Sequence, residues 1–290
     1  MPGFISFGQL NHYIKTYKYF RVVGTMEILN LIEKYNDLGI ADVIDHDRFN
    51  LISIDHHSTR IEGSTLTEVE AQVLINEGRT PNGKPLEESL MVTDHHAALL
   101  FTIANAKEKK TLSVTLLQNI NALVMKNTGK AYNTMLGTID SSTGAFRKGN
   151  VSTGISYFPN FDKVERLTTE LVKKLNESIN SPLSVSEQLN LSFDAHFNLV
   201  SIHPYYDGNG RTSRLLMNYI QAYFNLPLAI VRSENKAAYI QALIDTREQE
   251  NIKIFREFMA GEYAFLLNQE IGKFEEMKKP SKGSGFTFLF

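Results

Sequence analysis

The sequence contains no cysteine, and this absence removes several kinds of chemistry at once. Disulfides, thiolate catalysis and cysteine-bound metal sites are all excluded. The lack of cysteine suits a reducing cytoplasm. An excess of one charge is also missing, because the formal net charge is −2. The composition therefore gives no indication of nucleic acid or an anionic membrane as a partner.

Long apolar runs and targeting signals are missing as well. The first twenty residues lack the basic start, long apolar stretch and small-residue cleavage site of a signal peptide. Nowhere do 18 or more apolar residues run together, so no membrane span is expected. We therefore expect a cytoplasmic protein. Its 290 residues suffice for one large domain or a domain with a helical annex.

The apolar residues recur mainly with helical spacing. This spacing predicts helices over residues 25–35, 49–62, 86–107, 161–179, 186–202, 209–225, 233–247 and 251–278. Thr67 and Glu70 form a capping-box pattern that opens another helix, and Ser113 can cap one more. Glycines interrupt the pattern between residues 137 and 160, where aromatic and β-branched residues predict a short β-hairpin. The fold class is therefore mainly α.

Residues 203–214, HPYYDGNGRTSR, gather the features of an anion site. Pro204 disfavours the helical conformation at His203, so a helix should end there. Gly208 and Gly210 let the backbone turn tightly and approach a ligand closely. Another helix should start near Asn209. A glycine-flanked turn at a helix N-terminus collects free N–H donors and the positive end of the helix dipole.

The charged side chains of this segment suit a metal-bound polyphosphate. Arg211 and Arg214 are three residues apart, and two guanidinium groups fit a polyphosphate better than a single carboxylate. Asp207 would repel phosphate unless a divalent cation such as Mg²⁺ lay between them. The imidazole of His203 could take a proton from an incoming hydroxyl. A lone histidine or a lone Asp-Gly is usually structural, but the whole set within twelve residues favours a site.

The segment resembles the HxFx(D/E)GNGRxxR signature of the Fic family, whose best-known members adenylylate (AMPylate) proteins. Tyr205 replaces the usual Phe. The resemblance covers roughly residues 58–258. It implies a flap that clamps substrate and nucleotide, formed by Gly144, Ala145, Phe146 and Arg147 followed by Val151, Ser152, Thr153 and Gly154. It also implies that Tyr239 approaches the adenine, with Arg247 where many relatives have Asn near the base.

The resemblance implies a role for each residue of the signature. His203 would be the general base that activates a Ser, Thr or Tyr hydroxyl of a target protein, and Asp207 would hold Mg²⁺ on the α- and β-phosphates of ATP. Arg211 would neutralise the pyrophosphate leaving group, and Arg214 would reach the γ-phosphate. The implied ATP-binding set is Asp207, Gly208, Asn209, Gly210, Arg211, Thr212, Ser213, Arg214 and Tyr239. These roles suit a reaction that depends on positioning and charge neutralisation.

Residues 58–63, STRIEG, resemble the inhibitory signature (S/T)xxxE(G/N) of the same family. Ser58 and Glu62 are four residues apart, hence on one helical face, and Gly63 is a natural helix end. The resemblance implies that Glu62 pairs with Arg214 and forces ATP into an unproductive pose. An ordinary surface glutamate followed by glycine is the plain alternative.

These observations predict a Fic-type helical core with a short β-hairpin flap and an N-terminal helical annex. Residues 1–108 would form the annex, including an inhibitory helix over 49–63. Residues 109–258 would form the catalytic core, and residues 259–290 a C-terminal helix and tail. The histidine pairs at 56–57 and 95–96 are poor chelates, because adjacent helical residues point about 100° apart. We interpret them as partly buried polar packing.

The sequence thus predicts an autoinhibited protein adenylyltransferase that uses ATP and Mg²⁺ on a target protein and releases pyrophosphate. Three alternatives remain open. The same fold could remove AMP from a modified target, or it could use another nucleotide donor. In the third, the chain is a non-catalytic module that senses ATP. Helical proteins of this kind often pair, so a homodimer is compatible with the sequence.

Overall fold

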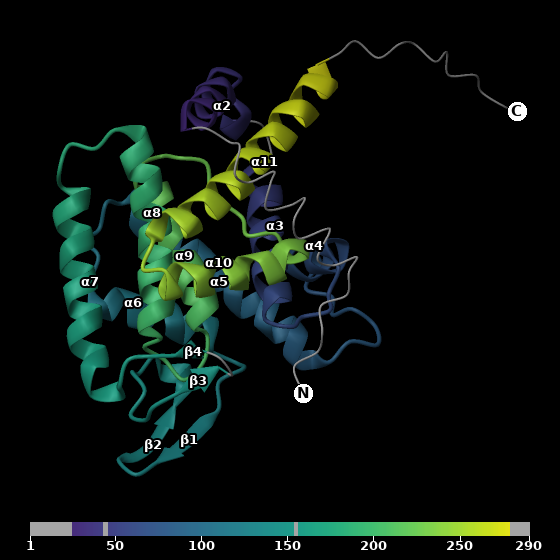
Figure 1. Cartoon of the computed structure of the whole chain (residues 1–290). Coiled ribbons are helices and arrows are strands. Elements are labelled where there is room, and N and C mark those ends of the chain that lie inside the picture. The colour runs from purple at the N-terminus through teal and green to yellow at the C-terminus, as the bar shows by residue number, and fades with distance from the viewer. Residues whose placement is uncertain (1–24, 43–45, 154–155, 279–290) are drawn as a thin grey trace, which may run out of the picture.

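The computed structural model describes residues 25–42, 46–153 and 156–278, and most of these residues are helical (Figure 1). The α-helices are α2 (Thr25–Asp37), α3 (His46–Ile61), α4 (Glu68–Glu77), α5 (Leu86–Lys107), α6 (Val114–Val124), α7 (Val164–Ile179), α8 (Val185–Ile202), α9 (Asn209–Tyr223), α10 (Lys236–Glu248) and α11 (Ile252–Lys278). Short 3₁₀ turns occur at Ile40–Asp42, Ser141–Thr143, Phe161–Lys163 and Ser233–Asn235. None of these helices is long and apolar enough to cross a membrane.

Side-chain caps define the starts of α4, α6 and α8. Thr67 and Glu70 form the predicted capping box at the start of α4, and the Ser113 hydroxyl accepts the N–H of Leu116 at the start of α6. Helix α8 begins one residue earlier than predicted. Its first turn is fixed by a capping box between Ser184 and Glu187 that the apolar spacing did not indicate.

The β-structure consists of two short antiparallel pairs rather than one hairpin. Strands β1 (Ala131–Thr134) and β2 (Gly137–Asp140) form the first pair, and β3 (Ser152–Thr153) and β4 (Ser156–Tyr157) the second. β1 lies outside the range where the sequence predicted strands. The pattern missed it because β1 has no buried residue to mark it. The hydroxyl of Thr134, which accepts from Leu136 N and donates to Gly137 O, holds the connecting turn.

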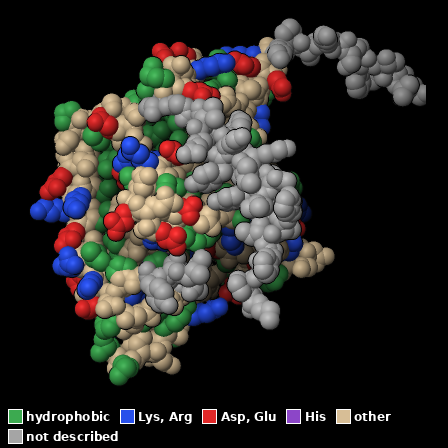
Figure 2. All heavy atoms as spheres, viewed as in Figure 1, with side chains coloured by type: hydrophobic (Ala, Val, Ile, Leu, Met, Phe, Trp, Pro, Cys, Tyr) green, Lys and Arg blue, Asp and Glu red, His purple; other side chains and the backbone are tan. Residues whose placement is uncertain are grey.

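Helix α9 lies at the centre of the fold and packs against α8 and α5 (Figure 1). Its predicted apolar face is confirmed, because Leu215, Leu216, Tyr219 and Ile220 are all completely buried. A rigid central helix fixes the residues at its N-terminus, and these belong to the signature segment. Lys and Arg side chains are interspersed with Asp and Glu over the face drawn in Figure 2, with no block of one sign.

The N-terminal helix α3 packs on α5 and α4, and α11 packs on α10 and α2. The boundary expected after residue 258 falls inside α11, which is one continuous helix. The division of the chain into three regions stays a prediction.

Candidate active site

The signature segment forms the turn between α8 and α9. His203 ends α8 in the left-handed conformation with φ 53°, and its N–H donates to Leu199 O at 3.0 Å. Gly208 precedes α9 with φ 76°. A Cβ on Gly208 would lie 2.8 Å from Asn121 Nδ2 and 2.9 Å from Met125 Sδ. Only glycine fits here, because both the backbone conformation and the close neighbours exclude a side chain.

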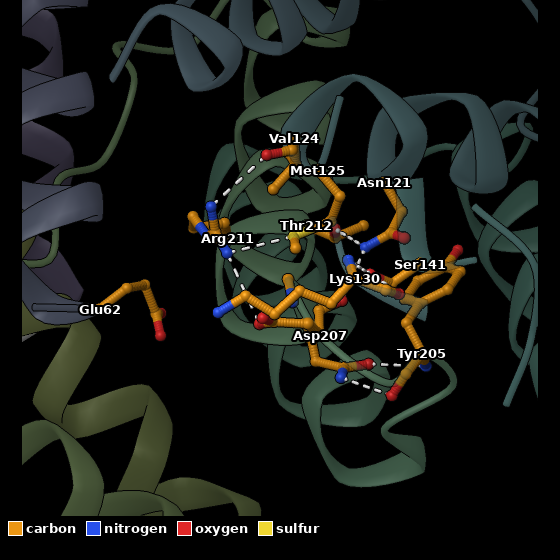
Figure 3. A network of polar contacts seen from close by, with 12 residues as sticks. Glu62, Asn121, Val124, Met125, Lys130, Ser141, Tyr205, Asp207, Arg211 and Thr212 are labelled. Atoms are coloured by element: carbon orange, nitrogen blue, oxygen red, sulfur yellow. Dashed lines mark hydrogen bonds and ion pairs between the residues drawn. The ribbon is translucent and has the colours of Figure 1, made fainter. Parts of the chain in front are cut away.

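Polar side chains within the segment hold this turn in shape. The Asn209 amide accepts from Tyr205 N and donates to Tyr205 O, both at 2.9 Å. Asn121 on α6 donates to the Asp207 carbonyl and to the Thr212 hydroxyl, each at 3.1 Å (Figure 3). The Ser213 hydroxyl donates to Asn209 O at 2.8 Å. The side chains of Asn209, Thr212 and Ser213 are therefore used within the turn.

Two buried arginines lie in the first two turns of α9. The side chains of Arg211 and Arg214 are each only 4% exposed. Arg211 reaches Val124 O at 3.4 Å and Met125 Sδ at 3.2 Å, and Arg211 Nη2 lies 3.6 Å from Asp207 Oδ1 (Figure 3). Within the described chain, Arg211 Nε and Arg214 Nη1 have no hydrogen-bond partner. Buried guanidinium donors without partners are energetically unfavourable. An anion bound at this helix N-terminus would supply the missing acceptors.

Glu62 supplies an anion from within the chain. It follows the last residue of α3 and enters from the side of the site opposite the α6 residues (Figure 3). Glu62 Oε1 lies 2.7 Å from Arg214 Nη2, and the Ser58 hydroxyl and carbonyl accept from Arg214 at 2.9 Å each. A Cβ on Gly210 would be 2.6 Å from Glu62 Oε1. The carboxylate therefore fills the space directly beside the first turn of α9.

The charge of Glu62 is maintained by the two arginines. Burial alone would raise the pKa of this carboxyl, but Arg214 and Arg211 together bring the pKa below its ordinary value. Arg214 responds in the opposite direction. Burial would lower its pKa, yet Glu62 raises it above the ordinary value. The pair is therefore ionised at neutral pH, and Gly63 follows it with φ 113°.

The geometry around His203 favours a neutral imidazole. Burial lowers its pKa to about 4, while the backbone bond to Val200 and the charge of Glu62 oppose this shift. His203 Nδ1 lies 3.3 Å from Val200 O, and a carbonyl can only accept a hydrogen bond. The proton is therefore assigned to Nδ1, and Nε2 keeps its lone pair. Such an imidazole can accept a proton at pH 7.

A cavity of about 430 Å³ joins these groups. Glu62, Gly210 and Arg214 line one part, together with His203. The rest of the lining includes the apolar α10 side chains of Ile240, Leu243 and Ile244, with Arg247 further along the helix. A pocket with a cationic end and an apolar wall matches the two halves of a nucleotide.

Tyr239 also lines this cavity, but its hydroxyl is engaged elsewhere. The hydroxyl lies 2.7 Å from His196 Nε2. Burial lowers the pKa of His196 well below its ordinary value, so the imidazole is neutral. The Tyr239 hydroxyl is therefore paired with a neutral imidazole behind the cavity wall.

Residues 111–221 match the model of the Fic/DOC family. These residues form a Fic/DOC domain. The chain is 30% identical over 206 residues to a protein of Drosophila melanogaster named protein adenylyltransferase Fic, covering 71% of this chain and 39% of that one. A protein of the same name from Drosophila persimilis is 29% identical, with 71% and 38% covered. The chain thus spans about two fifths of the length of these curated relatives.

Solved structures show the same fold. A Fic domain containing signaling protein from Bacteroides thetaiotaomicron superposes with a TM-score of 0.73 at 21% identity, covering 86% of this chain and 98% of that one. Fic-1 from C. elegans superposes with a TM-score of 0.69 at 22% identity, covering 91% and 74%. The Fic-type helical fold predicted from the sequence is therefore confirmed.

Phe158 and the contacts of Arg147 with the turn at residues 203–214 escaped the sequence analysis. Buried Arg147 donates to His203 O at 2.7 Å, Gly149 O at 2.9 Å and Pro159 O at 2.5 Å. Phe158 stacks on the imidazole of His203, with 3.9 Å between ring centroids. Arg147 thus ties the segment that carries Phe158 to the signature turn. The family resemblance placed Arg147 in the flap, but the sequence does not indicate its bonds to the signature turn.

The expected flap lies in this segment. Ser152 and Thr153 form β3, with Ser152 opposite Tyr157 and Thr153 opposite Ser156, and Val151 precedes the strand. Gly154 lies outside the described residues. The contact of these residues with substrate stays a prediction.

Asp207 is the residue available for a metal ion. Its side chain is 48% exposed, and Oδ1 accepts the N–H of Gly208 at 2.6 Å. The described part of the chain has no cluster of three or more His, Asp or Glu side chains that would bind a metal alone. A single exposed carboxylate beside an anion site fits Mg²⁺, which takes its other ligands from phosphate and water.

Proposed function

We propose that this chain is an autoinhibited protein adenylyltransferase, which transfers AMP from ATP to a Ser, Thr or Tyr hydroxyl of a target protein. One observation carries the proposal. A neutral histidine lines the same cavity as the first turn of α9 and the buried Arg214, and the buried Arg211 lies in that first turn. The names of the curated relatives support the same activity.

In the proposed reaction, His203 Nε2 takes the proton of the target hydroxyl while the hydroxyl oxygen attacks the α-phosphorus of ATP. The new bond joins that oxygen to phosphorus, and the bond from phosphorus to the bridging oxygen of pyrophosphate breaks. Arg211 and Arg214 stabilise the charge on the leaving pyrophosphate. The backbone N–H groups of residues 208–210 cradle the phosphates.

Mg²⁺ bound through Asp207 would neutralise phosphate charge. His203 returns to the neutral state when its proton passes to solvent. Thr212 and Ser213 contribute by shaping the turn, and the ring of Tyr239 contributes to the cavity wall.

Glu62 would inhibit this reaction by occupying the phosphate subsite. Its carboxylate is ionised, pairs with Arg214 and fills the space over Gly210. A triphosphate that binds the same cations must displace the carboxylate or bind in another pose, because the like charges repel. Ser58 keeps Arg214 turned toward Glu62 through two hydrogen bonds.

The proposal is tested by incubating purified proteins with Mg²⁺ and α-labelled ATP, alone and with cell lysate. We expect Glu62→Gly to raise autoadenylylation and ATP use above wild type, and His203→Ala to abolish both. Mass spectrometry of labelled peptides then gives the donor group and the acceptor residue. Equal labelling by wild type and Glu62→Gly would show the inhibitory assignment to be wrong.

The alternatives give different results in the same assay. Binding of ATP without label under any condition supports a non-catalytic sensor. Release of AMP from a modified target, lost in Glu62→Gly, supports the reverse reaction. A donor other than ATP is a second candidate, favoured by Arg247, whose side chain offers only hydrogen-bond donors to a base. The cytoplasmic location and the homodimer stay predictions.

A further inference from the structure

Helix α3 is attached to the domain by a buried carboxylate that the proposed reaction does not use. Asp55 is completely buried, and its two oxygens lie 2.6 Å from His95 Nδ1 and 2.6 Å from His96 Nδ1. Both histidines belong to α5. A buried carboxylate remains stable only where hydrogen-bond donors replace water, and two imidazole N–H groups supply them here.

Asp55 lies on the same face of α3 as the inhibitory residues. Ser58 is three residues further along the chain and Glu62 is seven, and side chains at these spacings share one face of a helix. The bonds from Asp55 therefore fix the rotation of α3 about its axis and its position along that axis relative to α5, two turns before Glu62. A small shift of α3 at this point would move the Glu62 carboxylate away from Arg214, since the pair depends on a single 2.7 Å contact.

The two histidines are held by a helix that also supports the catalytic turn. Asp94, the residue before His95, accepts from Asn127 N at 2.7 Å and Asn127 Nδ2 at 2.6 Å. α5 also packs against α9. Adjacent residues of α5 thus bind α3 and the segment after α6, and the position of Glu62 is set relative to the anion site.

We propose that Asp55, bound by His95 and His96, is a positioning residue that keeps Glu62 on Arg214. The inference rests on the proposed inhibitory role of Glu62. When the bonds of Asp55 are lost, α3 shifts, the carboxylate leaves Arg214, and the anion site opens to the triphosphate. Asp55 itself touches neither the nucleotide site nor the reacting groups.

The test is a double-mutant cycle between Asp55→Asn and Glu62→Gly, read as His203-dependent labelling with α-labelled ATP. Asn has the same shape as Asp but lacks the charge. In wild type, Asp55→Asn should raise labelling by about tenfold, a typical coupling between two sites. In the Glu62→Gly background it should change nothing, because the residue that it positions is absent. An equal rise in both backgrounds, or no rise in a folded wild-type background, overturns the proposal.

A second measurement does not depend on the transfer of AMP to protein. The same cycle is measured as Mg²⁺·ATP affinity with His203→Ala in every protein, by calorimetry. Asp55→Asn should tighten binding only where Glu62 is present. If Glu62→Gly gave no label, the proposed activity would fail, and this binding cycle would still decide the role of Asp55.

Controls separate positioning from loss of stability. Asp194→Asn is the matched control, because it removes the charge of a carboxylate paired with Arg256 at 2.5 Å, between α8 and α11. It should lower the Tm without raising labelling. His96→Gln is the second variant if Asp55→Asn fails to fold, since the His96 side chain is 23% exposed. It should act in the same direction, and labelling at the wild-type level by folded His96→Gln would count against the proposal.

Discussion

The ring of Phe158 lies nearly parallel to the imidazole of His203, with their planes inclined by 17° and their centroids 3.9 Å apart. The contact covers one face of the imidazole, and burial is the largest cause of the low pKa of His203. Phe158 follows strand β4, in the segment that Arg147 ties to the signature turn. The position of this segment therefore influences the basicity of the proposed catalytic residue.

Replacing Phe158 by Ala should move the acid limb of the pH–rate profile upward. A general base acts in its neutral form, so activity is lost as the pH falls through its pKa. In the wild-type site this pKa is about 4, and without the stacked ring it should rise toward the ordinary 6.5. The rate is measured from pH 4 to 8 in the Glu62→Gly background. Phe158→Leu, which keeps an apolar cover, should shift the limb less.

Gly210→Ala should reduce transfer even in the absence of Glu62. The added methyl would lie 3.2 Å from Arg214 Nη1 and, in wild type, 2.6 Å from Glu62 Oε1. It would push the carboxylate away but occupy part of the phosphate subsite itself. We expect Gly210→Ala/Glu62→Gly to bind Mg²⁺·ATP about tenfold more weakly than Glu62→Gly. Affinity equal to that of Glu62→Gly would show that phosphate does not approach Gly210.

Arg147→Met should destabilise the domain and detach the segment that carries Phe158. Three carbonyl groups would lose a charged donor. Hydrogen bonds to charged groups contribute about 1.5–3 kcal/mol each, and we expect a loss of about 3 kcal/mol in the free energy of unfolding. Urea denaturation measures this. Arg147→Lys should recover only part of the stability, because an ammonium cannot reproduce the planar arrangement of donors.

Asp207→Asn should raise the Mg²⁺ concentration needed for half-maximal labelling. An amide keeps the size of the side chain but binds Mg²⁺ more weakly than a carboxylate does. The bond from Asp207 Oδ1 to Gly208 N can persist in the variant, so the turn should keep its shape. A magnesium titration in the Glu62→Gly background measures the shift. An unchanged midpoint would assign the metal to other ligands.

Arg247→Asn should increase the preference for ATP over GTP. A guanidinium offers donors only and matches the adjacent acceptors of guanine, whereas an amide also accepts from the adenine amino group. Arg247 lies over the Phe158 ring at 5.9 Å and lines the cavity away from the phosphate end. We expect a change of about tenfold in the ratio of labelling rates in competition between the two nucleotides. No change would place the base elsewhere.

The sequence predicted the helical elements well because their apolar residues recur with a clear period, and because capping groups identify the starts of α4 and α6. Strand β1 was missed because none of its four residues is buried. The turn at residues 203–214 could be interpreted because all its determinants lie within twelve residues. The resemblance placed Arg147 in the flap, but its bond to His203 could not be predicted, since the two residues are 56 apart in the sequence. The histidines at 95 and 96 were set aside as packing, and their common partner Asp55 emerges only from the pairing of two helices.

The contact between Glu62 and Arg214 joins two parts of one polypeptide, so its strength does not depend on the protein concentration. An intramolecular contact has a fixed effective concentration, so inhibition by Glu62 should be the same in a crowded and in a dilute solution. After a proteolytic cut in the exposed loop at residues 78–85, the contact between Glu62 and Arg214 would join two separate fragments. The fragment with α3 could then dissociate, and the remaining domain would gain activity as the solution is diluted.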